Sequence, residues 1–241
     1  MFQSVKVAFS EYIGDFYRSI SATTKPMIEF RSRGLEKSIA WCPSRMIDTA
    51  EEMLSQWQRN DTDNAPTNPS KLPVILVAMA KDYVPTSREY TRQVAERQFV
   101  GIPEDTKGRM FGLRYISADI RTQICIFAAD EPTARSIAAQ FCLYIDAMSN
   151  RTFNALHEFA GFKLPFGIQL ETSDAPAMNI QTDAKNLTIL AIDLTLRCSV
   201  PMFDNPADNE PNDGLGTDGD FNDPHGYLVT NEAITKGYTI S

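Results

Sequence analysis

Two groups of residues in this chain could carry out chemistry: the acidic residues near the C-terminus and the two histidines. The stretch DGDFND, which begins at Asp218, places carboxylate and amide side chains at alternate positions, as at the start of a calcium-binding loop. Such a loop also needs glycine at its sixth position and glutamate at its twelfth, but this chain has Asp223 and Val229 there. We therefore expect a solvated acidic linker, for which only weak divalent-ion binding stays open, and we expect no metal site and no cofactor.

The histidines and cysteines do not form a catalytic pattern. His157 lies in RTFNALHEFAGF, which we interpret as a helix or the end of one, and His225 lies in the acidic C-terminal region. No Gly-x-Ser-x-Gly motif is present to hold a nucleophile. The cysteines are Cys42, Cys125, Cys142 and Cys198. They are far apart and form no Cys-x-x-Cys pair, which is typical of reduced thiols. We therefore predict that the protein is not an enzyme and has no catalytic residues.

The turn AADEPTA at 128–134 lies where many α/β enzymes bind phosphate, between a strand and a helix. A phosphate-binding turn uses glycines, so that backbone N–H groups can converge on the anion. This turn has no glycine, and the carboxylates of Asp130 and Glu131 would repel phosphate. Asp130 followed by Glu131 and Pro132 is instead typical of a helix N-terminus, and we expect Asp130 to cap that helix.

The negative charge of the chain is concentrated at its C-terminal end. Residues 203–241 contain eight acidic residues and one basic residue, a charge of −7, whereas the remaining 202 residues contain 23 acidic and 22 basic residues, a charge of −1. The chain has no run of lysine or arginine, which argues against specific nucleic-acid binding. Its longest apolar run, VILVAMA at 74–80, is too short to cross a membrane. The first residues lack the pattern of a secretory signal, so we expect a cytoplasmic protein.

The first 80 residues predict two helices and two strands. Residues 2–20 carry apolar residues at spacings of three and four, the pattern of an amphipathic helix in the core or at a subunit interface. PMIEFRSR at 26–33 alternates like a strand, and LPVILVAMA at 72–80 is typical of a buried strand. A short helix capped by Asp48 and a polar loop at 60–71 are expected between them.

Two longer strands are predicted at 115–127 and 187–200, each with one apolar and one polar face. The helix that begins at Asp130 lies between them in the chain. If the two strands pair in antiparallel fashion, Asp119 and Arg121 meet Arg197 and Asp193 across the polar face. The apolar faces, packed by the helices, then form the core.

These elements predict an α/β protein of the α+β type, in which a mostly antiparallel sheet is packed on one face by helices. We expect one domain at 1–202, with an insert at 81–110 whose pattern is weak. Residues 203–241 are rich in Asp, Asn, Gly and Pro and are expected to form an extended acidic C-terminal arm. Aromatic residues spaced along this arm could anchor it on another subunit, although a frayed tail is equally compatible with the composition.

The segment ADIRTQICIFAADEPTARSIAAQFCLYI, followed by LTILAIDLTLRC, resembles the tail-terminator and tail-completion proteins of the neck of tailed bacteriophages. In that family a long strand leads through a short polar turn into an alanine-rich helix, and a final strand returns beside it. The resemblance covers roughly residues 1–200 and implies a structural virion protein. Such a protein forms a ring, usually a hexamer, that terminates the tail tube or sheath and joins it to the head.

The resemblance also implies the partners and the location of the protein. The partners would be further copies of the chain and proteins of the tail tube, sheath or neck, with no membrane involved. DNA would pass through the lumen of the ring without specific binding. The protein would be assembled in the host cytoplasm and reside in the virion. The candidate interface residues are Phe9, Tyr12, Phe16, Asp119, Arg121, Asp193, Arg197, Phe203, Phe221 and Tyr227.

Two alternatives remain at this stage. One is another neck or baseplate connector protein of different symmetry. The other is a small α/β enzyme or ligand-binding module, whose site would be assembled from scattered residues such as Asp119, Arg121, Asp193 and Arg197 on one face of the sheet. Ring formation would favour a structural role, and stabilisation by nucleotides or metal ions would favour a ligand site.

Overall fold

The computed structural model of the chain describes residues 2–42, 72–80, 84–85, 97–171, 175–182, 184, 186–207 and 209–228. The helix expected after Asp48 and the loop expected at 60–71 lie outside these residues, as does most of 81–96. The described helices are α1 (Phe2–Ser19), α2 (Lys25–Ser32), α4 (Glu131–Asp146) and the short 3-10 helices η1 (Leu35–Lys37) and η3 (Met148–Asn150). The described strands are β1 (Ile39–Trp41), β2 (Val74–Met79), β3 (Val84–Pro85), β4 (Gln98–Gly101), β5 (Met110–Ala128), β6 (Thr152–Phe159), β7 (Phe162–Leu170), β8 (Ala177–Ile180) and β9 (Thr188–Asp204).

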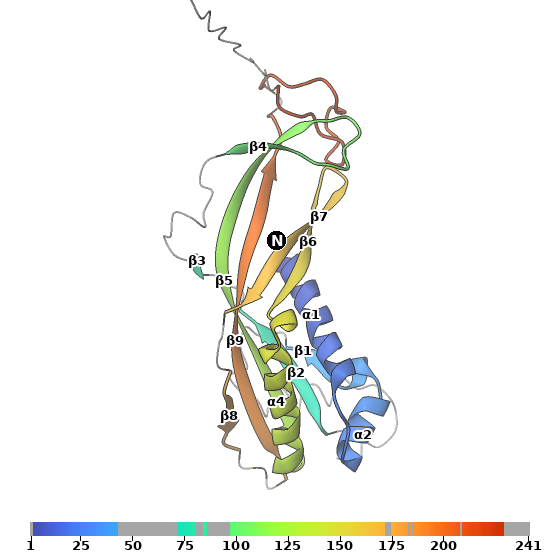
Figure 1. The fold of residues 1–241 in the computed structure, drawn as a ribbon, viewed down its shortest axis with the longest axis vertical. Coiled ribbons are helices and arrows are strands. Elements are labelled where there is room, and N and C mark those ends of the chain that lie inside the picture. The colour runs from blue at the N-terminus through green and yellow to red at the C-terminus, as the bar shows by residue number, and fades with distance from the viewer. Residues whose placement is uncertain are drawn as a thin grey trace, which may run out of the picture. The chain divides into compact units, whose positions relative to one another are not determined.

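The strands form a sheet in the order β1-β2-β5-β9-β7-β6, which is mostly antiparallel (Figure 1). β1 pairs with β2 in parallel, whereas β2 with β5 and β7 with β9 are antiparallel. β3 and β4 pair with β5, and β8 pairs with β9. The fold class is α+β, as the sequence predicts.

The chain divides into two compact units. The first consists of residues 1–88, 117–156 and 165–200, and the second of residues 89–116, 157–164 and 201–241. The long strands β5 and β9 therefore contribute residues to both units. The second unit takes in the C-terminal segment together with 89–116 and the turn between β6 and β7.

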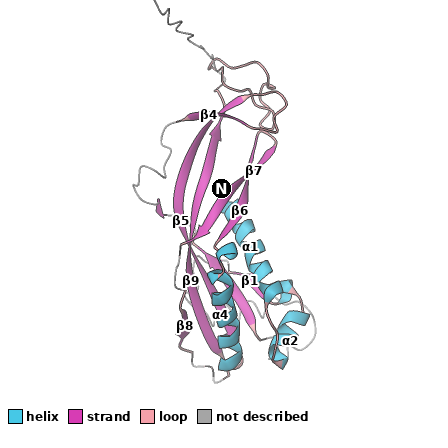
Figure 2. Ribbon diagram, in the orientation of Figure 1, coloured by secondary structure: helices cyan, strands magenta, loops and turns pink. Residues whose placement is uncertain are grey.

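Helices α1, α2 and α4 cover one face of the sheet in the first unit (Figure 2). The main hydrophobic core contains their buried residues together with Ile75 and Val77 of β2 and Ile124 and Ile126 of β5. The apolar face predicted for 187–200 lies in this core, and its six residues are at most 6% exposed. They are Leu190, Ile192, Leu194, Leu196, Cys198 and Val200. The alternation of the strand sequence therefore assigned its core face correctly, because successive side chains point to opposite faces of a sheet.

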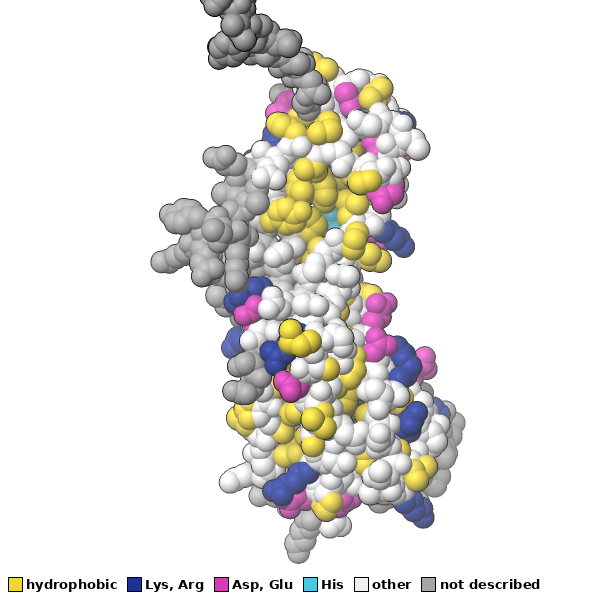
Figure 3. Space-filling view, in the orientation of Figure 1, with side chains coloured by type: hydrophobic (Ala, Val, Ile, Leu, Met, Phe, Trp, Pro, Cys, Tyr) yellow, Lys and Arg dark blue, Asp and Glu magenta, His cyan; other side chains and the backbone are white. Residues whose placement is uncertain are grey.

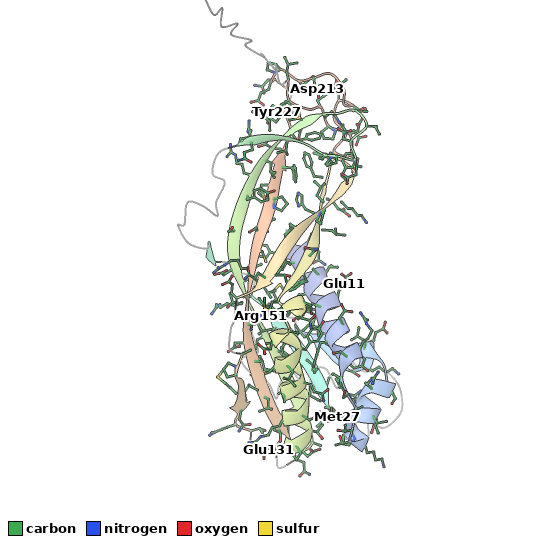
Figure 4. The ribbon with its side chains drawn as sticks, in the orientation of Figure 1. Glu11, Met27, Glu131, Arg151, Asp213 and Tyr227 are labelled. Atoms are coloured by element: carbon green, nitrogen blue, oxygen red, sulfur yellow. The ribbon has the colours of Figure 1, made fainter. Side chains whose placement is uncertain are left out.

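Helix α4 begins where the sequence predicts. The Oδ1 atom of Asp130 accepts a hydrogen bond from the backbone N–H of Thr133 at 2.8 Å, and its Oδ2 accepts from the Thr133 hydroxyl at 3.0 Å. Proline stands in the first turn of the helix, and Glu131 beside it is labelled in Figure 4. The turn at 128–134 is thus a helix cap, since its carboxylate satisfies a backbone donor that the helix leaves open.

The sheet also buries apolar residues on its second face. A separate cluster contains the alternate residues of the same strands, among them Leu76 of β2, Cys125 and Phe127 of β5, and Ala191 of β9. Cys125 and Phe127 are fully buried. The polar face expected for the long strands is therefore polar only over part of its length.

Two predictions of secondary structure were wrong. Residues 26–33, expected to be a strand, form helix α2, with Pro26 in its first turn. Met27 and Phe30, three residues apart, are buried, whereas Ile28 is 56% exposed, so the buried face has the period of a helix. His157, expected in a helix, lies in strand β6.

The second unit has its own small core. β4 pairs with the start of β5, with Phe99 opposite Gly112 and Val100 opposite Phe111. Phe111 is fully buried and packs edge-on against Phe159, at 5.0 Å between ring centroids. Phe159 in turn stacks on Phe203 at 5.1 Å. These contacts bring together three segments that are far apart in the chain.

Candidate functional site

Of the two pairs predicted across the polar face of the first unit, Asp119 with Arg197 is formed, whereas Asp193 is bonded to Gln123, where Arg121 was expected. Arg197 Nε lies 3.1 Å from Asp119 Oδ1, and Arg197 Nη1 lies 2.8 Å from Glu171 Oε1. Gln123 Nε2 donates to Asp193 Oδ1 at 2.8 Å. The pairs run in opposite directions along β5 and β9, which confirms the expected antiparallel arrangement. Glu171 was not singled out from the sequence, although FKLPFGIQLE at 162–171 alternates in the manner of a strand and places Glu171 on the same side as Lys163 and Gln169.

These residues form ion pairs at a partly exposed surface. The side chains of Asp119, Arg197 and Glu171 are each about a quarter exposed. Arg121 is exposed on the same strand as Asp119. Charges that neutralise one another in this way form a structured polar surface, and the arrangement does not itself activate a nucleophile or a base.

The aromatic residues of α1 are not at a surface. Phe9, Tyr12 and Phe16 are 0%, 5% and 2% exposed. Phe16 packs edge-on against Phe141 at 4.8 Å between ring centroids, and Tyr12 does so against Tyr144 at 5.3 Å. The expectation that these three residues form an interface is therefore corrected: they join α1 to α4 within one chain.

In the second unit, Arg109 is the centre of a buried polar cluster. Its guanidinium is 3% exposed and donates from Nε to Asp105 Oδ2 at 2.8 Å, and from Nη1 to Asp223 Oδ1 and to the Pro224 carbonyl, both at 2.7 Å. Lys107 Nζ donates to Asp223 as well. Hydrogen bonds from Arg109 lower the pKa of Asp105, and those from Lys107 and Thr217 lower the pKa of Asp223 to about 2. Both carboxylates are therefore charged at neutral pH.

A second cluster ties the segment after β9 to β4. Tyr227 donates its hydroxyl hydrogen to Asp204 Oδ1 at 3.0 Å, and Arg97 Nε lies 3.2 Å from Asp204 Oδ2. Arg97 also lies over the Tyr227 ring, which contacts Phe99 edge-on at 5.1 Å. Tyr227 and Asp213, both labelled in Figure 4, come from this same C-terminal segment. The segment expected to be an arm has little regular structure, and up to residue 228 it is bonded to the second unit.

A pocket of about 1090 Å³ lies in the second unit, between the β6–β7 turn and the C-terminal segment. Its charged and aromatic lining includes Glu158, Lys163, Asp218, Asp220, Phe221 and His225. Phe221 is 94% exposed. His225 Nδ1 accepts a hydrogen bond from the Gly216 N–H at 3.0 Å, so the proton of the neutral ring is on Nε2, 2.7 Å from Asp218 Oδ1.

The stretch 218–223 does not form a calcium loop. Asp218 pairs with His225, Asp220 accepts from the Asn222 N–H, and Asp223 belongs to the Arg109 cluster. Among the described residues, no three histidine, cysteine, aspartate or glutamate side chains converge as they would around a metal ion.

The remaining candidates for chemistry are held in apolar surroundings. His157 stacks on Phe203 at 6.0 Å between ring centroids, and burial lowers the pKa of His157. Burial also raises the pKa of the Cys125 and Cys198 thiols to about 12 and that of Cys42 to about 11. These thiols are protonated at neutral pH and are therefore poor nucleophiles.

On the face shown in Figure 3, acidic and basic side chains are scattered among hydrophobic ones and form no large patch of one sign. No helix in the described part of the chain combines the length and apolar character needed to cross a membrane. No protein-family model matches the chain, and no curated protein matches it significantly. The function must therefore be argued from the residues and their arrangement.

Proposed function

We propose that this chain is a structural virion protein of a tailed bacteriophage, without enzymatic activity. In this proposal it forms a ring, most simply a hexamer, at the neck or tail end, where it terminates the tail tube or sheath and joins it to the head. The observation that carries the proposal is the arrangement of β5, α4 and β9. The long strand β5 leads through the Asp130 cap into α4, and the second long strand, β9, returns antiparallel to β5. These elements are the part of the sequence that resembles the tail-terminator family.

The order of the other elements agrees with the resemblance only in part. The opening helix α1 and the strand β2 precede β5 as expected, but the strand expected at 26–33 is helix α2, and β6, β7 and β8 lie between α4 and β9. The family's fold does not determine a function by itself. The proposal therefore also needs surfaces on which copies could meet.

The exposed surfaces of both units suit assembly. In the first unit, the helices lie on one face, and the ion pairs of Arg197 with Asp119 and Glu171 lie on a part of the sheet that remains partly exposed. In the second unit, Phe221 and Leu228 are 94% and 62% exposed. Exposed apolar side chains with polar groups around them are typical of protein interfaces. A closed ring would need a heterologous contact, in which two different surfaces of the chain meet.

The decisive experiment is to determine the oligomeric state of the purified chain by mass photometry and negative-stain microscopy, together with mass spectrometry of tailed particles from cells that carry the gene. We expect rings of one size and the chain as a component of the particles. A chain that stays monomeric at all concentrations and is absent from the particles would contradict the proposal.

A matched pair of variants would locate the contact. Phe221→Ala should leave the free energy of unfolding nearly unchanged, because the side chain is 94% exposed, but should reduce the population of rings. Leu143→Ala, which removes a 72% exposed side chain on α4, is the control and should affect neither property. Equal effects of both variants on ring formation would exclude Phe221 as a specific contact.

The pocket of the second unit supports one competing function, that of a ligand-binding module. A concave site lined by apolar and charged groups is the usual form of a small-molecule site. Thermal shift measurements with nucleotides, amino acids, sugars and divalent ions would test it. A specific increase in melting temperature, without ring formation, would favour this second function over the structural one.

A further inference from the structure

The C-terminal segment contains two Asp-Gly pairs whose surroundings differ sharply. They are Asp213–Gly214 and Asp218–Gly219, and both glycines have positive φ, +68° and +75°. Because glycine has no side chain, its backbone nitrogen can approach the carboxyl carbon of the preceding aspartate more freely than that of any other residue. The two pairs are therefore chemically alike, and only the folded structure distinguishes them.

Both reacting groups of the first pair are held in hydrogen bonds. The Oδ1 atom of Asp213 accepts from the backbone N–H of Leu215 at 3.0 Å and from that of Gly226 at 2.9 Å. The Gly214 N–H donates to Asn212 Oδ1 at 3.0 Å. Neither the carboxyl nor the nitrogen can move toward the other without breaking these bonds.

The second pair is open. The Asp218 side chain is 98% exposed, and its one hydrogen bond in the described part of the chain is with His225 Nε2. Within those same residues, the Gly219 N–H donates no hydrogen bond. The pair forms the centre of a turn that is closed by the Asp220 N–H donating to the Thr217 carbonyl at 3.1 Å. Within the described residues, only the bond with His225 at an exposed carboxyl would have to open before the carboxyl carbon of Asp218 could approach the nitrogen of Gly219.

We propose that Asp218 is a site of spontaneous isoaspartate formation. The Gly219 nitrogen attacks Cγ of Asp218, and a C–N bond forms while the C–O bond of the protonated carboxyl breaks. The leaving oxygen departs as one water molecule that carries the carboxyl proton and the Gly219 amide proton, and a succinimide ring remains. One water molecule then opens the ring: attack at Cγ restores aspartate, and attack at the main-chain carbonyl carbon gives isoaspartate. No oxidant, reductant or other reactant is needed.

The modification would alter the wall of the pocket. Isoaspartate adds one methylene group to the main chain between Thr217 and Gly219 and turns the former main-chain carbonyl into a free carboxylate. The Asp218 contact with His225 and the Thr217–Asp220 turn both depend on the original geometry. Phe221, on the same loop, would be displaced with them. This inference does not rest on the proposed virion function, since it depends only on the bonds of the second unit.

The test is to incubate the full-length protein at neutral pH and 37 °C, and to measure isoaspartate at both positions by peptide mass spectrometry with electron-transfer fragmentation. In the folded protein we expect roughly tenfold more isoaspartate at 218 than at 213, because the bonds around Asp213 and Gly214 must open first. In guanidinium chloride, where those bonds are absent, the two positions should react at similar rates. Asp218→Glu should abolish the product at 218, because its longer side chain would have to close a larger ring.

A further variant tests the role of the hydrogen bonds directly. Asn212→Ala removes the acceptor of the Gly214 N–H and should raise the yield at 213 several-fold in the folded protein, without changing the yield at 218. Equal yields at 213 and 218 in the folded wild-type protein would overturn the proposal. It would also be overturned if no product formed at 218 over a period in which the unfolded chain reacts at both positions.

Discussion

Arg109 and Asp223 are 114 positions apart in the chain, and their side chains are joined at 2.7 Å between Nη1 and Oδ1. The same guanidinium binds Asp105, four residues before it, and the carbonyl of Pro224. Arg109 therefore connects the loop before β5 to the C-terminal segment within the second unit. Because the arginine side chain is almost completely buried, its positive charge is stabilised by these partners in place of water.

We expect Arg109→Ala to destabilise the second unit by about 3–5 kcal/mol, because the substitution leaves the buried Asp105 carboxylate without its partner. Urea denaturation would measure the loss, and limited proteolysis should show earlier cleavage between 205 and 228. Lys107→Ala is the control: Lys107 binds the same Asp223 but is 40% exposed, so its loss should cost about 1 kcal/mol or less. Equal losses in the two variants would show that burial of the Arg109 pair does not matter.

The stability of the protein should fall in acid, in a defined range of pH. Asp223 has a pKa of about 2 in the folded protein because of hydrogen bonds from Lys107 and Thr217, against 3.8 for an ordinary aspartate, and Arg109 lowers the pKa of Asp105. A carboxyl with a lowered pKa stabilises the fold above its unfolded pKa and loses this contribution as the pH falls to its folded pKa. The free energy of unfolding should therefore be nearly constant above about pH 5 and fall between about pH 4 and pH 2.

Asp223→Asn tests the assignment of this acid effect. The variant should be less stable than the wild type near neutral pH, and its decrease between about pH 4 and pH 2 should be smaller, because one titrating group has been removed. Chemical denaturation at a series of pH values would measure both curves. An unchanged decrease in the variant would show that other carboxyls cause the loss.

Gly226 is required by the close approach of three segments. A Cβ atom at this position would overlap the Asp213 carboxylate and would lie 2.8 Å from Arg109 Cβ and 3.0 Å from the Met110 nitrogen. We expect Gly226→Ala to cost about 1–3 kcal/mol in the free energy of unfolding. Gly167→Ala is the matched control, since no atom lies within 4 Å of the added methyl group, and it should change stability by about 0.5 kcal/mol or less. Similar costs at both positions would contradict the crowding at Gly226.

The ion pair between Asp119 and Arg197 should contribute little to stability, because both side chains are about a quarter exposed. A double-mutant cycle with Asp119→Ala and Arg197→Ala should give a coupling energy of about 0.2–1 kcal/mol, and the coupling should decrease as salt is added. A coupling that is several times larger and insensitive to salt would mean that the pair is shielded from solvent in the protein as it exists in solution.

The best-predicted part of the fold consists of the strands β5 and β9 and the helix α4. Alternating apolar residues in the two strands and the capping residue Asp130 are local features, and each was in the place that the structure shows. The pairing of Asp119 with Arg197 followed from the same alternation, since an antiparallel partner places residues of matching face opposite one another.

The errors arose where short patterns fit two structures. PMIEFRSR alternates over only a few residues, and packing of Met27 and Phe30 against the core decided for a helix. The aromatic stripe of α1 fits either a core or an interface. The contacts of its rings with Phe141 and Tyr144 of α4 decide for a core within one chain. The virion function stays a prediction, because it rests on a resemblance and on exposed surfaces.

The sequence by itself determined the α+β class, the two-faced strands and the cap of α4, because these depend on residues close together in the chain. Only the tertiary structure decided that Arg109 bonds to Asp223 and that the Gly226 N–H donates to Asp213. It also decided that the hydrogen bonds around the two Asp-Gly pairs differ. Arg109 and Asp223 are 114 positions apart, and even the bonds of Gly226 with Asp213 and of His225 with Asp218 need the chain to fold back on itself. No local pattern specifies which donor will meet which acceptor. That choice is made by the packing of the whole chain, in which buried charges must find partners.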